Sequence, residues 1–178
     1  MSRPLSNAIA CAAALACCLY AQPESKFRLY RVDDNVYRGR QPNKEDIPDL
    51  AAARIRTVLD LRGVLDHKGW EKAAVQAAGM RYVRIGLSGV LPPTQRQVDR
   101  ILAVLEDPAQ RPVYVHCRRG SDRSGEVIAC YRITHYHWTN AQALQEARDH
   151  GLSSLEVLMQ RFIRHFNPAP LPAAAGAQ

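Results

Sequence analysis

The sequence lacks any run of 18 or more apolar residues, which excludes a multi-span membrane protein. It has 20 Arg but only 4 Lys, and no block of basic residues is interleaved with aromatics, so nucleic-acid binding has no local support. The formal net charge of +7 suits an anionic partner, but an ordinary solvated surface explains it more simply. Because 47% of the residues are apolar, disorder over most of the 178 residues is also excluded.

Cysteine is scarce beyond the N-terminal segment, since three of the five Cys lie within residues 1–21. That segment has a short basic start and a small apolar run over residues 8–21, which is typical of a secretory signal peptide. The pattern Ala14-Leu15-Ala16 resembles a cleavage site, and the following Cys17 is a candidate lipoprotein anchor. We therefore expect an exported, periplasmic protein whose membrane contact is at most this N-terminal anchor. An uncleaved amphipathic arm is the alternative.

Residues 27–166 are expected to form one domain, followed by a disordered Pro- and Ala-rich tail over residues 167–178. Short apolar strand patterns alternate with helical ones, which predicts an α/β fold with a mainly parallel central sheet flanked by helices on both faces. The last helix is expected to open with a capping box from Ser153 to Glu156. In such sheets ligands bind where a strand leads into a helix, which directs attention to the loop after Val113-Tyr114-Val115.

That loop and its flanks read HCRRGSDRSG over residues 116–125. A bare Cys-x5-Arg motif is weak evidence for a catalytic loop, because roughly half a match is expected by chance in a chain of this composition. The added His, two Gly and hydroxyl at fixed offsets, between a strand and a helix, make the signal strong. A loop that closes onto a helix N-terminus directs its backbone N–H groups at an anion. We expect Gly120 and Gly125 to allow its tight curvature.

The loop also supplies a nucleophile and an anion clamp. The helix dipole and the guanidinium of Arg123 favour a Cys117 thiolate at neutral pH. Arg123 can hold two phosphate oxygens in the ground and transition states. Ser124 can donate a hydrogen bond to the thiolate when it leaves, and His116 is expected to order the loop through its ring nitrogens.

This signature resembles that of the cysteine-dependent protein tyrosine and dual-specificity phosphatases. Further segments resemble the plant and fungal atypical dual-specificity phosphatases and their bacterial relatives, over about residues 29–166; they include Val36-Tyr37-Arg38-Gly39, Thr57-Val58-Leu59-Asp60-Leu61-Arg62 and Ile85-Gly86-Leu87-Ser88-Gly89. The resemblance implies the single-domain cysteine-phosphatase fold and a covalent phosphocysteine intermediate that water hydrolyses. It implies no metal and no organic cofactor, with catalytic Cys117, Arg123 and Ser124. Substrate contacts are implied at Arg118, Arg119, Gly120, Ser121 and Gly125.

The sequence departs from this family at the general acid. Residues 88–95, where most members carry an Asp, contain no carboxylate. Asp122, inside the loop, is the expected substitute proton donor, although it could instead brace the loop against a neighbouring Arg. Asp66 is a second candidate if its loop folds over the site. Because a missing acid matters least for leaving groups of low basicity, we expect aryl phosphates or phosphoanhydrides over phosphoserine.

Three other functions remain open at this level. Arg118, Arg119 and Lys68 could admit an inositol polyphosphate or pyrophosphate to the same mechanism. A pseudophosphatase would bind phosphorylated ligands without turning them over. A sulfurtransferase also uses a loop Cys at a helix start, but gives no reason for Arg123 and Ser124 at these offsets. The expected partner is therefore a phosphorylated protein or a small polyphosphorylated substrate.

Overall fold

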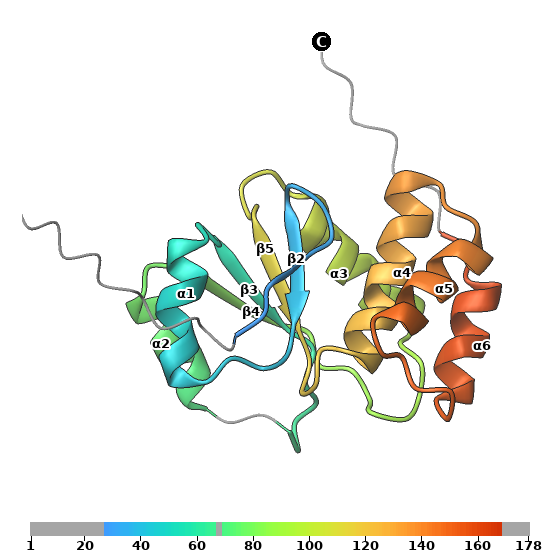
Figure 1. Ribbon diagram of the computed structural model, residues 1–178, viewed down its shortest axis with the longest axis horizontal. Helices are drawn as coiled ribbons and strands as arrows, with labels where there is room; N and C mark the ends of the chain where they lie inside the picture. The colour runs from blue at the N-terminus through green and yellow to red at the C-terminus, as the bar shows by residue number, and fades with distance from the viewer. Residues whose placement is uncertain (1–26, 67–68, 169–178) are drawn as a thin grey trace, which may run out of the picture.

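The computed structural model describes residues 27–66 and 69–168. Five strands form one sheet in the order β1-β2-β5-β3-β4 (Figure 1). The strands are β1 (Tyr30–Arg31), β2 (Val36–Gly39), β3 (Thr57–Asp60), β4 (Arg81–Arg84) and β5 (Val113–His116). The sheet begins with a hairpin, because β1 pairs antiparallel with β2. The other pairings are parallel, as the alternation of strands and helices predicts.

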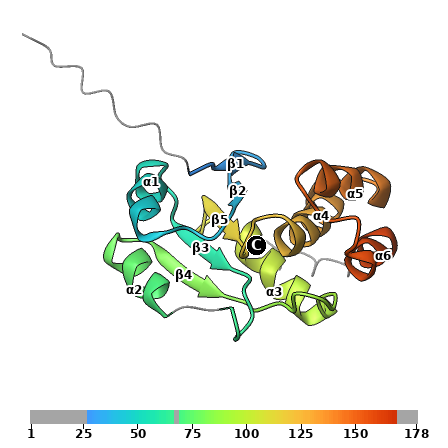
Figure 2. The same ribbon diagram turned by 60° about the horizontal axis from the view of Figure 1, so that its bottom comes forward.

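Helices cover both faces of the sheet (Figure 2). On one face lie α1 (Ile47–Ala52), preceded by a 3-10 turn at Lys44–Asp46, and α2 (Trp70–Ala77). On the other lie α3 (Gln95–Glu106), α4 (Asp122–Tyr136), α5 (Asn140–Asp149) and α6 (Val157–His165). No helix within the described ranges is long and apolar enough to cross a bilayer.

The period of two in the strands divides the core into two clusters. Val58 and Tyr114 point to the face covered by α1 and α2, where they pack with Leu50 and Val75. Their strand neighbours Leu59 and Val115 join the larger cluster beneath α3 to α6. Because both faces are covered, β3 and β5 are buried along their whole length, which places the end of β5 at the centre of the molecule.

The structure corrects one helix boundary. Ser153 does not cap α6, which begins at Val157 with Glu156 as its N-cap and no side-chain cap. The backbone N–H of Ser153 instead donates to Asp122 Oδ1 at 3.1 Å, and its hydroxyl accepts from the Leu155 N–H. This long-range contact fixes Ser153 in a turn, so the helix starts three residues later than the capping pattern predicts.

The expectations for residues 1–21, including Cys17, and for Lys68 fall outside the described residues, as does the tail from residue 169 onward. Residues 167–168, the described start of that tail, are in neither a helix nor a strand.

Candidate active site

The cysteine loop, residues 117–121, connects the central strand β5 to the buried helix α4. β5 lies between β2 and β3, so both neighbouring strands end beside the loop. Ser121 is the N-cap of α4, and the helix begins at Asp122. The loop amides therefore precede the positive end of a helix dipole, which is the arrangement that the sequence predicts for an anion site.

A buried arginine on β2 fixes the loop from behind. Arg38 is 2% exposed, and its Nη2 donates to the carbonyl oxygens of Gly120 and Ser121 at 2.9 and 3.2 Å. Burial lowers the pKa of Arg38, while the charges of Glu146 and Cys117 oppose that shift. Gly120 has φ of +80°, and a Cβ there would lie 2.3 Å from the carbonyl carbon of Gly39. The loop therefore requires glycine at position 120 for both conformation and space.

The loop opens into a hollow of about 590 Å³. Four segments supply its lining, which consists of Asp66, Gly89, Cys117, Arg118, Arg119, Asp122, Arg123 and Glu156. Cys117 is 2% exposed, and its Sγ accepts a hydrogen bond from the Gly120 N–H at 3.2 Å. The hollow thus brings together Cys117, Arg123, Arg118, Arg119 and Asp122, which the sequence analysis had selected.

Arg123 already has an anionic partner in this structure. Its Nη1 donates to Asp66 Oδ2 at 2.9 Å, and its side chain is almost fully buried. Asp66 follows β3 and is one third exposed at the mouth of the hollow. The loop that carries Asp66 therefore does reach the site, the condition on which its candidacy depended.

Asp122 is engaged on two sides. Its Oδ2 accepts from Arg119 Nη2 at 2.7 Å and its Oδ1 from the Ser153 N–H at 3.1 Å. Burial alone would raise the pKa of Asp122, but the hydrogen bonds from Arg119 and Ser153 outweigh it and lower the pKa. These contacts stabilise the ionised form, which is the behaviour of a bracing carboxylate rather than of a proton donor.

Three other predicted residues have different surroundings. Ser124 Oγ is buried with no hydrogen-bond partner in the described part of the chain, so it is available for the thiolate. The role assigned to Gly125 in loop curvature is wrong. Gly125 lies inside α4 without a positive φ, and a Cβ there would make ordinary contact with Ala147 and Arg38.

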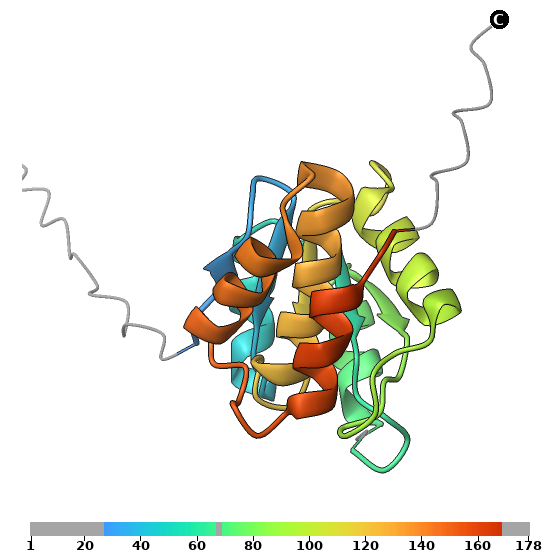
Figure 3. The same cartoon turned by 90° about the vertical axis from the view of Figure 1, so that its right-hand side faces the viewer.

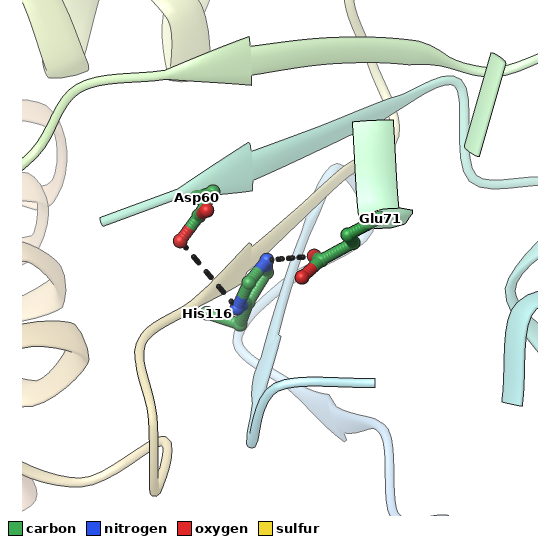
Figure 4. Close-up of side chains that lie close together, drawn as sticks. All are labelled: Asp60, Glu71 and His116. Atoms are coloured by element: carbon green, nitrogen blue, oxygen red, sulfur yellow. Dashed lines mark ion pairs between the residues drawn. The ribbon is translucent and has the colours of Figure 1, made fainter. Parts of the chain in front are cut away.

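His116 is linked to a buried charge network beneath the loop (Figure 4). Its Nε2 lies 2.7 Å from Glu71 Oε1 and its Nδ1 lies 3.9 Å from Asp60 Oδ1, while Nδ1 is also 3.3 Å from the Cys117 carbonyl oxygen. Both carboxylates also bind Arg62, which donates to the two oxygens of Asp60 at 2.8 and 2.7 Å and to Glu71. His116 therefore connects α2 and β3 to the nucleophile, as a loop-ordering residue would.

The charges in this network stabilise one another. Burial would raise the pKa of Asp60, but hydrogen bonds from Arg62 and Tyr82 and the charge of His116 hold it far below its usual range. Asp60, Glu71 and His116 are close enough to hold a metal ion. The guanidinium of Arg62 already supplies the cation between the two carboxylates, so the donor set fits an ion-pair network rather than a metal site.

Sequence reasoning gave no role to Arg38 or to the pair of Arg62 and Glu71. The available signal was a charged residue within an apolar strand pattern, at Arg38, and directly after one, at Arg62. Both are among the largest fully buried side chains. The loop after β4 contributes Gly89 to the hollow, and its residues 88–95 supply no carboxylate, as the sequence indicates.

The chain is similar in sequence to curated phosphatases. It is 28% identical over 144 residues to the inositol diphosphatase DSP1 of rice, covering 79% of this chain and 64% of that protein. It is 31% identical over 134 residues to the dual specificity protein phosphatase TpbA of Pseudomonas aeruginosa PAO1, covering 72% of this chain and 56% of that protein. The match thus spans less than two thirds of the length of either relative.

Solved structures share the fold. The core catalytic domain of the phosphatase SIW14 from Saccharomyces cerevisiae superposes with a TM-score of 0.70 at 22% identity, over 78% of this chain and 85% of that one. TpbA of P. aeruginosa superposes with a TM-score of 0.67 at 24% identity, over 79% and 86%. A family model described as DSP-PTPase phosphatase fused to NAD+ kinase matches residues 22–165. With its cysteine loop, its fold and this match, the chain belongs to the family of DSP-PTPase phosphatases fused to NAD+ kinase.

Proposed function

We propose that this chain is a cysteine-dependent phosphatase that hydrolyses phosphate monoesters through a phosphocysteine intermediate on Cys117. The observation that carries the proposal is the placement of Cys117 Sγ in the loop that leads into α4, where it accepts from the Gly120 N–H in the same hollow as Arg123. A nucleophile, an anion clamp and helix-terminal amides in one site are the parts that phosphoryl transfer to a thiolate requires.

In the first step the thiolate of Cys117 attacks phosphorus. The S–P bond forms while the P–O bond to the leaving group breaks, and the leaving oxygen takes up a proton. Arg123 and the loop N–H groups stabilise the charge on the three equatorial oxygens. In the second step water attacks phosphorus, the S–P bond breaks, and phosphate leaves. Ser124 can then donate its free hydroxyl proton to the departing thiolate in a hydrogen bond.

We assign the proton transfers to Asp66 in preference to Asp122. A bound phosphate competes for the Nη1 donor of Arg123 that Asp66 holds at 2.9 Å, which would release this carboxyl beside the leaving group. Asp66 gives its proton to the leaving oxygen in the first step and takes one from the attacking water in the second. Asp122 remains bound to Arg119 and Ser153 and holds the loop.

The charge of the hollow favours a monoester of phosphotyrosine type over an inositol polyphosphate or pyrophosphate. Three arginines line the hollow, at positions 118, 119 and 123, but so do three carboxylates, those of Asp66, Asp122 and Glu156. One phosphate dianion can use the loop and Arg123, whereas further phosphates would face these carboxylates. TpbA has been solved with phosphotyrosine, which is the same class of ligand.

The test is phosphate release from phosphotyrosine peptides, phosphoserine peptides and inositol polyphosphates, with Cys117→Ser and Cys130→Ala beside the unmutated protein. Cys130 is a buried thiol on α4 that does not line the hollow, so it is the matched control. We expect release from phosphotyrosine peptides that is lost in Cys117→Ser and kept in Cys130→Ala. Tight binding of phosphate esters without release by the unmutated protein would indicate a pseudophosphatase, and thiosulfate-dependent sulfur transfer would indicate a sulfurtransferase.

We also propose that the protein is exported to the periplasm through residues 1–21. The support is the short basic start, the apolar run of residues 8–21 and the Ala14-Leu15-Ala16 pattern. The mass of the protein recovered from its native host decides between the alternatives. Cleavage after Ala16 leaves a chain that begins at Cys17, and lipidation adds the mass of the acyl chains to it. An intact Met1 would overturn the proposal.

A further inference from the structure

Exposed aliphatic side chains gather around the mouth of the hollow. Nine large apolar residues are exposed in the described part of the chain, and the only two outside this region are the tyrosines at positions 30 and 136. The remaining seven form what we call the apolar rim, defined as Val64, Leu65, Val90, Leu91, Leu155, Val157 and Leu158. Monomeric soluble proteins rarely expose their aliphatic residues in one group, and such a group marks an interaction surface.

Each part of the rim adjoins a residue that lines the hollow. Leu65 precedes Asp66, Val90 follows Gly89, and Glu156 lies between Leu155 and Val157. The three segments that carry the rim, after β3, after β4 and at the start of α6, all lie at the end of the molecule to which the cysteine loop belongs (Figures 1 and 3). The rim therefore flanks the phosphate site.

The helix that carries part of the rim is basic on its exposed side. α6 contains no acidic residue, and its exposed positions continue from Val157 and Leu158 to Arg161 and Arg164. Residues 157, 161 and 164 share one helix face because they are four and three residues apart. Arg118, at the mouth of the hollow, has no ion-pair partner within the described residues. Apolar and cationic groups side by side complement a surface with hydrocarbon beneath a layer of anionic phosphates.

We propose that the apolar rim docks on an anionic lipid bilayer, where it brings a phosphate monoester on a lipid headgroup within reach of Cys117. This deepens the proposed function and depends on it for the chemistry, but not for the docking. The rim side chains come from three separate segments beside a polar hollow. A single extended peptide cannot cover all three at once, whereas a bilayer surface can receive each tip while one headgroup phosphate enters the hollow.

The docking is tested on Cys117→Ser protein, which binds without turnover, by co-sedimentation with three kinds of vesicle. These are phosphatidylcholine alone, phosphatidylcholine with phosphatidylglycerol, and phosphatidylcholine with phosphatidic acid. We expect binding to both anionic vesicles, tighter for phosphatidic acid because its headgroup is a phosphate monoester, and little binding to phosphatidylcholine. Failure to bind either anionic vesicle at about 0.1 M salt, where long-range attraction is screened, overturns the proposal.

A triple variant tests the rim itself. Leu65→Ser with Leu91→Ser and Leu155→Ser should weaken vesicle binding by roughly tenfold for each leucine that inserts. Its thermal unfolding should be unchanged because the three side chains are exposed. Tyr136→Ser is the control, since it removes a partly exposed aromatic side chain at the far end of α4 and should leave vesicle binding as it was. It also removes the hydrogen bond to Asp33 Oδ2, so its thermal unfolding is measured beside that of the triple variant. Equal vesicle binding by the triple variant and the control overturns the proposal that the apolar rim is the docking surface.

Other occupants give different results. If a second copy of the chain covers the rim, sedimentation velocity will show a dimer that the triple variant loses, with no vesicle binding. If a protein covers it, the variant will lose affinity for phosphotyrosine peptides with aliphatic flanks, again with no vesicle binding. Either result overturns the proposal that the apolar rim docks on a bilayer. Vesicle binding with no phosphate release from any substrate by the unmutated protein leaves docking intact and overturns only the proposed function.

Discussion

Arg123 Nη1 and Asp66 Oδ2 lie 2.9 Å apart, which joins the anion clamp of the cysteine loop to a carboxylate 57 positions earlier in the chain. In this pairing Asp66 occupies a donor that a bound phosphate would use. The site therefore holds its own counter-anion, and binding a phosphate exchanges one anion for another. In the proposed mechanism, this exchange frees Asp66 to act as the acid, although the loop after β4 carries no carboxylate.

The two carboxylates predict opposite kinetic outcomes. Asp66→Asn should lower kcat for phenyl phosphate by about a hundredfold, the lower range for general-acid catalysis, and lower it much less for p-nitrophenyl phosphate, whose leaving oxygen needs no proton. Asp122→Asn should lower kcat for both substrates by a similar factor, because it loosens the contact of residue 122 with Arg119 and Ser153. The ratio of kcat for the two substrates is the measurement. A ratio that changes in Asp122→Asn and not in Asp66→Asn contradicts the assignment.

Replacement by alanine should lower the unfolding free energy at Gly120 and raise it at Gly125. Gly120→Ala places a Cβ 2.3 Å from the Gly39 backbone at φ of +80°, and should cost about 2 to 5 kcal/mol of unfolding free energy together with most of the activity. Gly125→Ala meets only ordinary contacts, at 3.5 Å, inside α4, and should gain up to about 1 kcal/mol. Denaturant unfolding of both variants checks this. Similar destabilisation in the two would contradict the assigned packing.

Glu71 should matter for stability and for rate. Glu71→Gln keeps the shape but removes a charge from a buried network, which leaves Arg62 undercompensated and should cost about 3 kcal/mol. The loss of the Glu71 contact with His116 should also lower kcat, because His116 contacts the Cys117 carbonyl. Lys72→Gln, on the exposed side of the same helix, should change the unfolding free energy by less than about 0.5 kcal/mol. An unchanged kcat in a folded Glu71→Gln protein would show that Glu71 does not act on the cysteine loop through His116.

Glu126 predicts how stability depends on pH. Burial, with a smaller contribution from the charge of Glu156, raises the pKa of Glu126 from its ordinary 4.5 to about 8, and neither carboxyl oxygen has a partner in the described residues. The folded state therefore holds a proton that the unfolded state releases. The stabilisation is fully present below about pH 4.5 and is lost as pH rises to about 8, on the order of 2 to 4 kcal/mol.

Glu126→Gln is the test of that dependence. The variant should unfold at higher denaturant concentration than the unmutated protein at pH 8.5 or so, and the difference should shrink toward pH 5, where Glu126 is protonated in the fold. A parallel pH dependence in the two proteins would show that Glu126 does not titrate in this range.

Much of the fold follows from local pattern. The alternation of strands and helices and the start of α4 after the cysteine loop both agree with the sequence, because each depends on residues close together in the chain. The boundary of α6 did not follow, since the Ser153 N–H is bound by Asp122, 31 positions away. Gly125 was misread because α4 already begins at Asp122, so this glycine lies in regular helix and needs no positive φ.

The sequence by itself determined the cysteine loop, its likeness to the cysteine phosphatases and the parallel α/β architecture. Each of these depends on the periodicity or the spacing of residues that are close together in the chain. Only the tertiary structure decided that Arg38 supports the loop, that Asp66 reaches Arg123, that three carboxylates balance three arginines, and that the exposed aliphatic residues flank the hollow. Those features depend on which chain segments meet at the carboxyl ends of the parallel strands. The packing of the whole core, and no local segment, decides which chain segments come together there.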